Sequence, residues 1–283
     1  MKNILVPTDF SETSKNAAHY AMHLAEQTGA QRIILFNAYQ APVYYDPMVP
    51  AVQLIDESEL KQASIQQLNK FRMTLLAFCP KNCLMDIYCE YGLLHQGLDE
   101  VCQRTESDMI VMGITGGGMI EEKLIGSNTI AVVHNSSYPV IIVPSKANFT
   151  PINNMMLLCD FEKADTSIPV VPIRQFKNKT GARLLVFNNR PGAMGAGNEL
   201  PAKVLSESYA VHTVLQDMDP EYHYAANNDF LDSVHAFALE KQVDLIISIA
   251  KPHGFFESLF KESHTRKLAF HSHLPIMAIR AVE

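Results

Sequence analysis

The segment that decides the fold class reads Gly113-Ile114-Thr115-Gly116, then nine residues, then Gly126-Ser127-Asn128-Thr129. An apolar run from Met109 to Met112 leads into it, and a run typical of a helix follows it. Glycine has no Cβ, so it lets a backbone turn sharply and come close to a ligand. The first turn of a helix offers free N–H groups and a favourable dipole to an anion. We therefore predict that this is a phosphate-binding segment of an α/β protein.

Strands and helices alternate on both sides of this segment. Short apolar runs separated by helical patterns predict a parallel sheet that is covered by helices on both faces. A helix capped by Ser11 or Thr13 is expected to end near Gly29. The other expected helices are residues 56–78, 95–104 and 127–135, and the expected strands are residues 3–6, 33–36, 85–89, 109–112 and 139–144.

The second half of the chain repeats the first. Residues 3–10 correspond to residues 154–161 at an offset of 151, and residues 108–143 have ungapped counterparts at an offset of 136. Two collinear matches joined by one deletion indicate a duplication. We predict two tandem open parallel-sheet sandwich domains of five strands each, residues 1–147 and 148–283. The second copy is expected to be shortened between its second and fourth strands.

Composition narrows the class of protein. The chain has 283 residues, of which 47% are hydrophobic and 19% charged, so a folded globular protein is expected. A net charge of −7 argues against a nucleic-acid binder, which needs a basic face. The chain starts directly on a strand pattern, no apolar run is long enough to span a membrane, and the five cysteines are expected to be reduced. These features predict a cytoplasmic protein with no membrane partner.

The first predicted strand ends at Pro7-Thr8-Asp9 and the fourth at Gly113. In open parallel sheets, ligands bind outside the carboxyl ends of the strands where the strand order reverses. Asp9 is interpreted as a carboxylate for ribose hydroxyls, or for a metal ion carried by the phosphates. Its alternative role is to cap the following helix.

The second copy loses the glycines. Gly113 becomes Ile249, Gly116 becomes Pro252 and Gly126 becomes Glu262, whereas Ser127 and Thr129 keep the counterparts Ser263 and Thr265. A branched side chain, a missing amide donor and a carboxylate each oppose the binding of a triphosphate. We expect the second site not to bind that ligand.

These motifs resemble the universal stress protein family. The resemblance rests on the spaced glycines, on the opening Ile-Leu-Val-Pro-Thr-Asp-Phe-Ser and on the closing Tyr-Pro-Val-Ile-Ile-Val. It implies an adenine nucleotide alpha-hydrolase-like fold, ATP binding by members that keep the glycines, and dimerisation through the last strand. In a tandem chain, residues 139–143 and 275–279 are expected to pair with each other as an intrachain pseudo-dimer. Association of two whole chains into a homodimer is the alternative.

The resemblance also implies a set of nucleotide-binding residues at the carboxyl ends of the strands and at the helix that follows the glycines. In chain order, the residues that would contact the adenine, the ribose or the phosphates are Pro7, Thr8, Asp9, Ala38, Met112, Gly113, Gly116, Gly126, Ser127, Asn128 and Thr129.

Two departures bear on the ligand. Gly117 follows the second motif glycine, where many ATP-binding members carry a basic residue, and Glu121 and Glu122 add negative charge that Lys123 would offset. ATP, with or without Mg²⁺, is the expected ligand. AMP is the alternative nucleotide.

The cysteine and histidine groups elsewhere in the chain give only weak indications of a metal site. Cys79 and Cys83 have zinc-like spacing but lack a second ligand pair, and His19 and His23 lack a third ligand. His271-x-His273 with His253 or His264 forms no tight ligand motif. No metal site is therefore expected. The Tyr- and Pro-rich stretch 39–50 is expected to be a loop, with a lid or a partner surface as the alternative.

No catalytic machinery is visible. The chain lacks a nucleophile elbow, a P-loop and a dinucleotide fingerprint, so any ATP hydrolysis is expected to be slow and incidental. We predict an ATP-binding regulatory protein of the stress response that is not an enzyme, with a structural or regulatory second domain. The alternatives are an interaction or scaffold protein that binds no nucleotide, and a weak nucleotidase.

Overall fold

The computed structural model describes residues 1–41, 56–114, 127–159, 167–190, 202–250 and 274–281. The strands are β1 (Asn3–Pro7), β2 (Arg32–Tyr39), β3 (Leu84–Tyr91), β4 (Met109–Gly113), β5 (Val140–Val143), β6 (Asn154–Leu158), β7 (Arg183–Asn189), β8 (Glu221–Ala225), β9 (Leu245–Ala250) and β10 (Ile276–Arg280). The helices are α1 (Glu12–Thr28), α2 (Glu57–Leu75), α3 (Leu94–Arg104), α4 (Ser127–Asn135), α6 (Val170–Thr180), α7 (Ala202–Leu215) and α8 (Phe230–Glu240), with 3₁₀ turns η1 (Leu76–Phe78) and η2 (Gln216–Met218).

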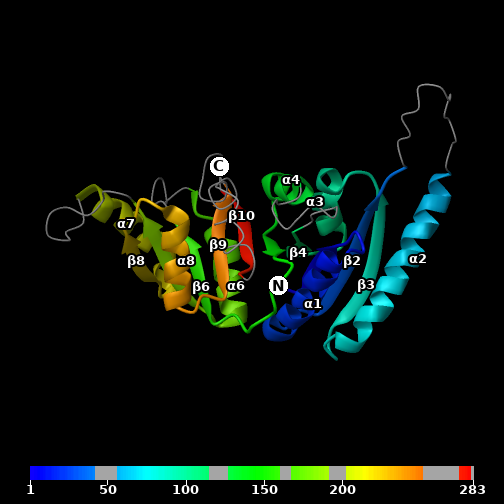
Figure 1. Ribbon diagram of the computed structural model, residues 1–283, viewed down its shortest axis with the longest axis horizontal. Helices are drawn as coiled ribbons and strands as arrows, with labels where there is room; N and C mark the ends of the chain where they lie inside the picture. The colour runs from blue at the N-terminus through cyan, green and yellow to red at the C-terminus, as the bar shows by residue number, and fades with distance from the viewer. Residues whose placement is uncertain (42–55, 115–126, 160–166, 191–201, 251–273, 282–283) are drawn as a thin grey trace, which may run out of the picture.

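The described strands form one sheet in the order β3-β2-β1-β4-β5-β10-β9-β6-β7-β8 (Figure 1). Neighbouring strands are parallel within each half, which confirms the predicted α/β class. The two halves meet where β10 pairs antiparallel with β5, with Met277 opposite Ile141. This is the pairing of closing strands that the sequence predicted. The pairing joins the two five-stranded halves into one sheet, because each closing strand satisfies the open edge of the other.

The duplication extends to individual hydrogen bonds. The Asp108 carboxylate accepts a hydrogen bond from the backbone N–H of Asn3 at 3.0 Å, and the Asp244 carboxylate accepts one from that of Asn154 at 2.9 Å. In both halves this bond joins the start of the fourth strand to the start of the first. The two copies therefore share a scaffold, and differences between them point to function.

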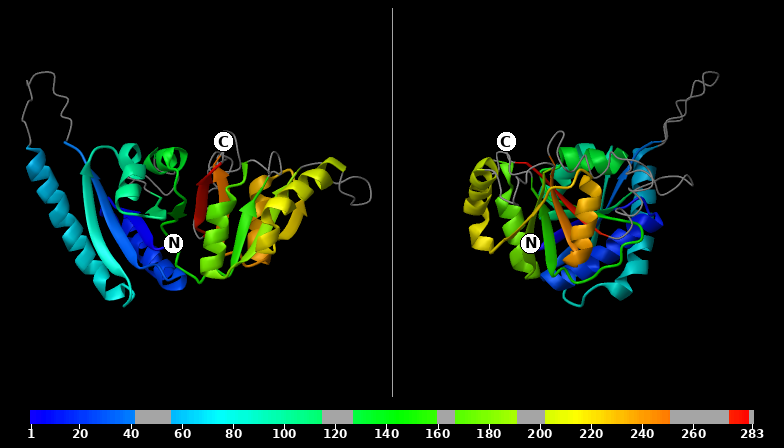
Figure 2. Two further views of the ribbon diagram at one scale, coloured as in Figure 1. Left: turned by 180° about the vertical axis from the view of Figure 1, so that it is seen from behind. Right: turned by 60° about the vertical axis from the view of Figure 1, so that its left-hand side comes forward.

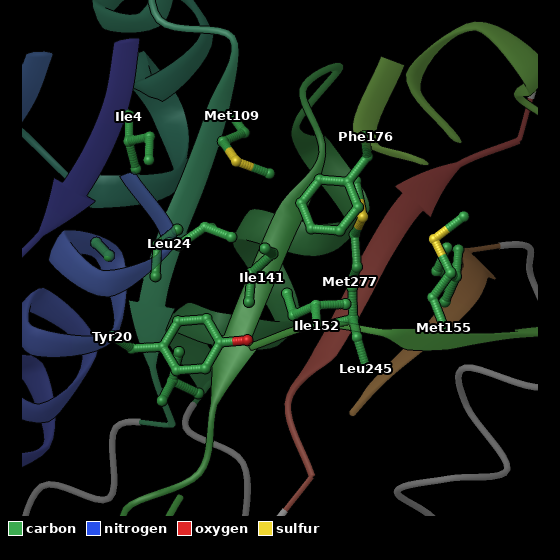
Figure 3. Packing of buried hydrophobic residues seen from close by; sticks show 14 of the residues in the cluster. Ile4, Tyr20, Leu24, Met109, Ile141, Ile152, Met155, Phe176, Leu245 and Met277 are labelled. Carbon is green, nitrogen blue, oxygen red and sulfur yellow. The ribbon is translucent and has the colours of Figure 1, made fainter. Parts of the chain in front are cut away.

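Helices cover both faces of the sheet (Figure 2). On one face, α1 and α2 of the first half and α6 and α7 of the second pack on a single apolar cluster that runs through the junction (Figure 3). On the other face, α3 and α4 cover the first half and α8 covers the second. Among the described residues, no helix is long and apolar enough to cross a bilayer, and no three potential ligand side chains gather around a metal position. None of the five cysteines, all of them described residues, forms a disulfide.

Polar contacts fix the junction between the halves. The Gln27 amide donates to the Ile152 carbonyl and accepts from the Ile152 N–H, both at 2.9 Å. The Tyr20 ring packs edge-on against Phe149 at 5.0 Å between ring centroids. Because these contacts join α1 to the segment between β5 and β6, the two halves are held together by more than the β5–β10 pair.

The Tyr20 hydroxyl is buried without a hydrogen-bond partner in the described part of the chain. Burial, followed by the charge of Asp244, raises its pKa well above the usual range for tyrosine. Because a buried unpaired hydroxyl carries a desolvation cost, we expect Tyr20→Phe to raise the free energy of unfolding by about 1 kcal/mol. Urea denaturation followed by circular dichroism measures this change. The matched control is Tyr209→Phe, at a side chain that is 73% exposed, where little change is expected. A Tyr20→Phe protein less stable than wild type would contradict the assignment.

Candidate functional site

A cavity of about 100 Å³ lies at the carboxyl ends of β1, β2 and β4. β1 lies between β2 and β4, so the strand order reverses here, as the sequence argument requires. The residues that line the cavity are Pro7, Thr8, Asp9, Ser14, Asn37, Ala38, Leu94, Met112, Gly113 and Asn128. The structure thus brings seven of the eleven predicted residues together around one cavity. Ser14, Asn37 and Leu94 are additional.

The turn after β1 is held in an unusual backbone conformation. Phe10 has φ +66°, a left-handed region that bulky side chains rarely adopt. Its N–H donates to Thr8 Oγ1 at 2.9 Å, and Thr8 Oγ1 lies 2.9 Å from Ser14 Oγ in a second hydrogen bond. The Phe10 ring packs edge-on against Phe71 of α2 at 5.8 Å. Thr8 therefore shapes the wall of the cavity, and its hydroxyl is already occupied.

Asp9 is exposed and keeps acceptor capacity. Its Oδ1 accepts from the backbone N–H of Ser11 at 3.1 Å and from the Ser11 hydroxyl. Ser11 is the helix cap, because its Oγ accepts from the Ser14 N–H at 3.2 Å. The alternative role of Asp9 as the cap is therefore excluded. Oδ2 of Asp9 has no partner among the described residues, so it is available to a ligand that donates hydrogen bonds.

Asn37 belongs to the scaffold of the site. It is buried, its amide donates to the Thr8 carbonyl at 2.8 Å, and its Oδ1 accepts from the Ser64 hydroxyl at 2.7 Å. Its counterpart Asn188 donates in the same way to the Cys159 carbonyl at 2.7 Å. The sequence carried a signal for this residue, a polar side chain recurring at the end of both second strands.

Gly113 is needed for helix packing. A Cβ at this position would lie 2.7 Å from the Thr13 carbonyl oxygen, too close for any real contact. The first turn of α1 therefore rests directly on the end of β4, and the close approach predicted for a ligand is made by a helix. In the second half Ile249 takes this position.

The beginning of α4 lies beside the cavity. Asn128 lines it, and Thr129 is fully buried with its Oγ1 unpaired among the described residues. Buried hydroxyls are nearly always hydrogen-bonded, so an unpaired one next to a cavity marks a place for a ligand or water. Ser127 begins α4, but its side chain lies outside the described residues. Gly116 and Gly126 also lie outside them.

Larger side chains stand at the corresponding positions of the second half. Ala38 corresponds to Asn189, and Leu94 corresponds to Phe230. The Asn189 side chain donates to the Asn227 carbonyl at 2.9 Å and accepts from the Asn227 N–H at 3.0 Å. The Asn189 and Phe230 side chains are both larger than those of the first half, so we expect them to leave less space at this edge of the sheet. The other predicted changes, Pro252 and Glu262, the retained Ser263 and Thr265, and the four histidines 253, 264, 271 and 273 lie outside the described residues.

Comparison with known proteins agrees with the observed fold. The family model described as the universal stress protein family matches residues 1–144. A universal stress protein of Methanocaldococcus jannaschii is 29% identical over 144 residues, which is 50% of this chain and 81% of the relative. A second one from that organism is 22% identical over 160 residues, 51% of this chain and 96% of the relative. The crystal structure of a universal stress protein from Archaeoglobus fulgidus covers 98% of both chains with a TM-score of 0.70 at 16% identity, which shows a shared fold.

Proposed function

This chain belongs to the universal stress protein family, and from that premise we propose that it is a cytoplasmic regulatory protein of the stress response whose first half binds ATP. The observation that carries the proposal is the cavity at the carboxyl ends of β1, β2 and β4, around which seven sequence-predicted residues meet. A volume of about 100 Å³ is smaller than the roughly 300–1,000 Å³ of pockets that enclose whole ligands. The cavity therefore suits one part of a nucleotide, and the remainder would extend beyond it.

The chemistry of the lining fits a nucleoside. Asp9 offers a carboxylate oxygen to ribose hydroxyls, a charge-assisted hydrogen bond of the stronger kind. Ala38 and Met112 give the cavity an apolar wall that suits the face of a base. Pro7 and Gly113 complete the wall without polar side chains.

The phosphates would lie toward the start of α4. The helix has nine residues, and its first turn presents N–H groups that favour an anion. Asn128 lies on the cavity, and the unpaired Thr129 hydroxyl is buried within the same turn. In this arrangement α1, β2, α3 and α4 all contribute residues to the binding of one ligand. Nucleotide binding would therefore change how these elements pack and which surface the protein offers to partner proteins. Slow hydrolysis would be incidental to that role.

A second candidate is an interaction protein that binds no nucleotide. The specific observation in its favour is Gly113, whose lack of a Cβ is already explained by the packing of Thr13. In that case the glycine would be retained for the fold, and the cavity would be a consequence of strand order.

Equilibrium dialysis with labelled ATP and labelled AMP separates the two candidates. We expect Asp9→Asn to bind ATP about tenfold more weakly, because a hydrogen bond to a charged group contributes about 1.5–3 kcal/mol. The asparagine keeps the Oδ1 that holds Ser11, so the turn survives. Glu12→Gln is the matched control, since it removes the same charge nearby from a side chain that is 91% exposed.

Equal retention of ATP by wild type and Asp9→Asn would remove Asp9 from the site. Absence of both nucleotides from wild type would favour the interaction protein. Rapid phosphate release that Asp9→Asn abolishes would favour a nucleotidase.

A further inference from the structure

A second cavity, of about 450 Å³, lies between α3 and α4. The two helices lie side by side on one face of the first half (Figure 1), and none of the residues around this cavity lines the first one. Leu98 and Val132, both almost fully buried, form its apolar base. The remaining side chains around it are polar, which distinguishes it from a packing defect in the core.

These polar side chains mostly offer acceptors. Asp99 Oδ1 accepts from the Ser136 hydroxyl and Oδ2 accepts from the Ser137 N–H, both at 2.8 Å, which leaves a lone pair on each oxygen. His95 Nδ1 is buried with no hydrogen-bond partner in the described chain. The Asn135 side-chain amide donates a hydrogen bond to the Ala131 carbonyl at 2.8 Å, and its Oδ1 accepts no hydrogen bond from the described residues.

The charge of the cavity is negative. Asp99 is an acidic lining residue, and the described residues that line the cavity include no lysine or arginine. Arg104, at the end of α3, is held by Glu90 at 2.8 Å and by Glu100 at 3.4 Å. Asp99 therefore has no cationic partner within the described residues, and it lines a cavity that has room for one.

We propose that this cavity binds an organic cation, a guanidinium or a primary ammonium group. Asp99 supplies the counter-charge, and Asn135 Oδ1 accepts a further hydrogen bond from it, beside the ring of His95. A guanidinium presents several N–H donors in one plane, which matches a carboxylate with a neutral acceptor nearby. The cation is either that of a small alkylguanidine or alkylamine, or that of a basic side chain on a partner protein. The proposal does not depend on nucleotide binding.

The second half shows that the fold does not require these acceptors. At the offset of 136, His95 corresponds to Leu231 and Asp99 to His235, although α8 has the same 11-residue length as α3. Asp99 does have a structural role in the first half, because it joins α3 to the end of α4. The experiment has to separate that role from binding.

Isothermal titration calorimetry with agmatine, and separately with a short arginine-containing peptide, tests the proposal on the whole chain. We expect Asp99→Asn to weaken binding at least about tenfold, since hydrogen bonds to charged groups contribute about 1.5–3 kcal/mol. The amide Oδ1 still accepts from the Ser136 hydroxyl, but the Nδ2 that replaces Oδ2 cannot accept from the Ser137 N–H, so the melting temperature of this variant is measured beside its affinity. Glu100→Gln is the matched control, because it removes the same charge from the next residue, which does not line the cavity.

His95→Phe serves as a second variant, because it changes a ring that lines the cavity and whose Nδ1 makes no hydrogen bond to the described residues. We expect it to weaken binding with an unchanged melting temperature. Agmatine binding with the same affinity as the peptide assigns the site to the cation alone, and tighter peptide binding assigns it to a protein partner. Both outcomes support the proposal. No heat of binding with either ligand, or equal losses in Asp99→Asn and Glu100→Gln, would overturn it.

Discussion

Gly113→Ala is expected to lower the free energy of unfolding by about 2–3 kcal/mol, a large effect for one methyl group. The added Cβ would lie 2.7 Å from the Thr13 carbonyl oxygen and 2.8 Å from Thr13 Cγ2. The carbonyl belongs to the first turn of α1, so it retreats only if the helix start moves away from β4. Ser14 lies in that turn and lines the cavity, and Ser11, just before it, holds Asp9, so the same displacement would disturb the candidate site.

Gly97→Ala is the matched control for this prediction. Gly97 lies in α3, and a Cβ there would meet nothing within 4 Å. Because alanine is the better helix former, this change is expected to raise the free energy of unfolding by about 0.5–1 kcal/mol. Urea denaturation of both variants gives the comparison. Equal stability of Gly113→Ala and wild type would mean that α1 does not rest on β4 as described, and would return Gly113 to a role in ligand approach.

The fold was predictable because its signals are local and repeated. The run Met109 to Met112 is apolar throughout, which is typical of a parallel strand buried on both faces, and it is part of β4. The helix expected at residues 127–135 spans those residues as α4. The sequence repeat also indicated that β5 and β10 are the closing strands of the two halves, and therefore that these two strands could pair. The shortening of the second copy is visible in α7, with 14 residues where α2 has 19.

The site was predictable only in part, because part of it depends on packing between distant elements. Leu94 and Ser14 reach the cavity from α3 and α1, and no pattern around either residue shows how those helices sit on the sheet. Phe10 adopts a left-handed backbone that its residue type disfavours, so local propensity gives no indication of the turn that presents Asp9. Gly113 lines the cavity, but the contact that requires a glycine there is with Thr13, which is far away in sequence.

Filling the cavity with the side chains of the second half is expected to abolish nucleotide binding. The double variant Ala38→Asn and Leu94→Phe places an amide and an aromatic ring where the first half has its open space. Asn189 and Phe230 show that the shared scaffold accepts both side chains at these positions. Because a base or ribose would have to displace them, we expect ATP affinity to fall at least 100-fold, equivalent to about 2.7 kcal/mol or more. Equilibrium dialysis with labelled ATP measures the loss.

Leu93→Phe is the control for the double variant. Leu93 precedes Leu94, is 39% exposed and does not line the cavity, so ATP binding is expected to stay at the wild-type level. Thermal unfolding of all three proteins establishes that the double variant is folded when its affinity is measured, since both positions are only partly buried in the first half. A folded double variant that retains ATP as wild type does would show that the nucleotide binds elsewhere. The difference between the two halves would then reflect drift in an unused cavity, and the case for an interaction protein without nucleotide would become the stronger one.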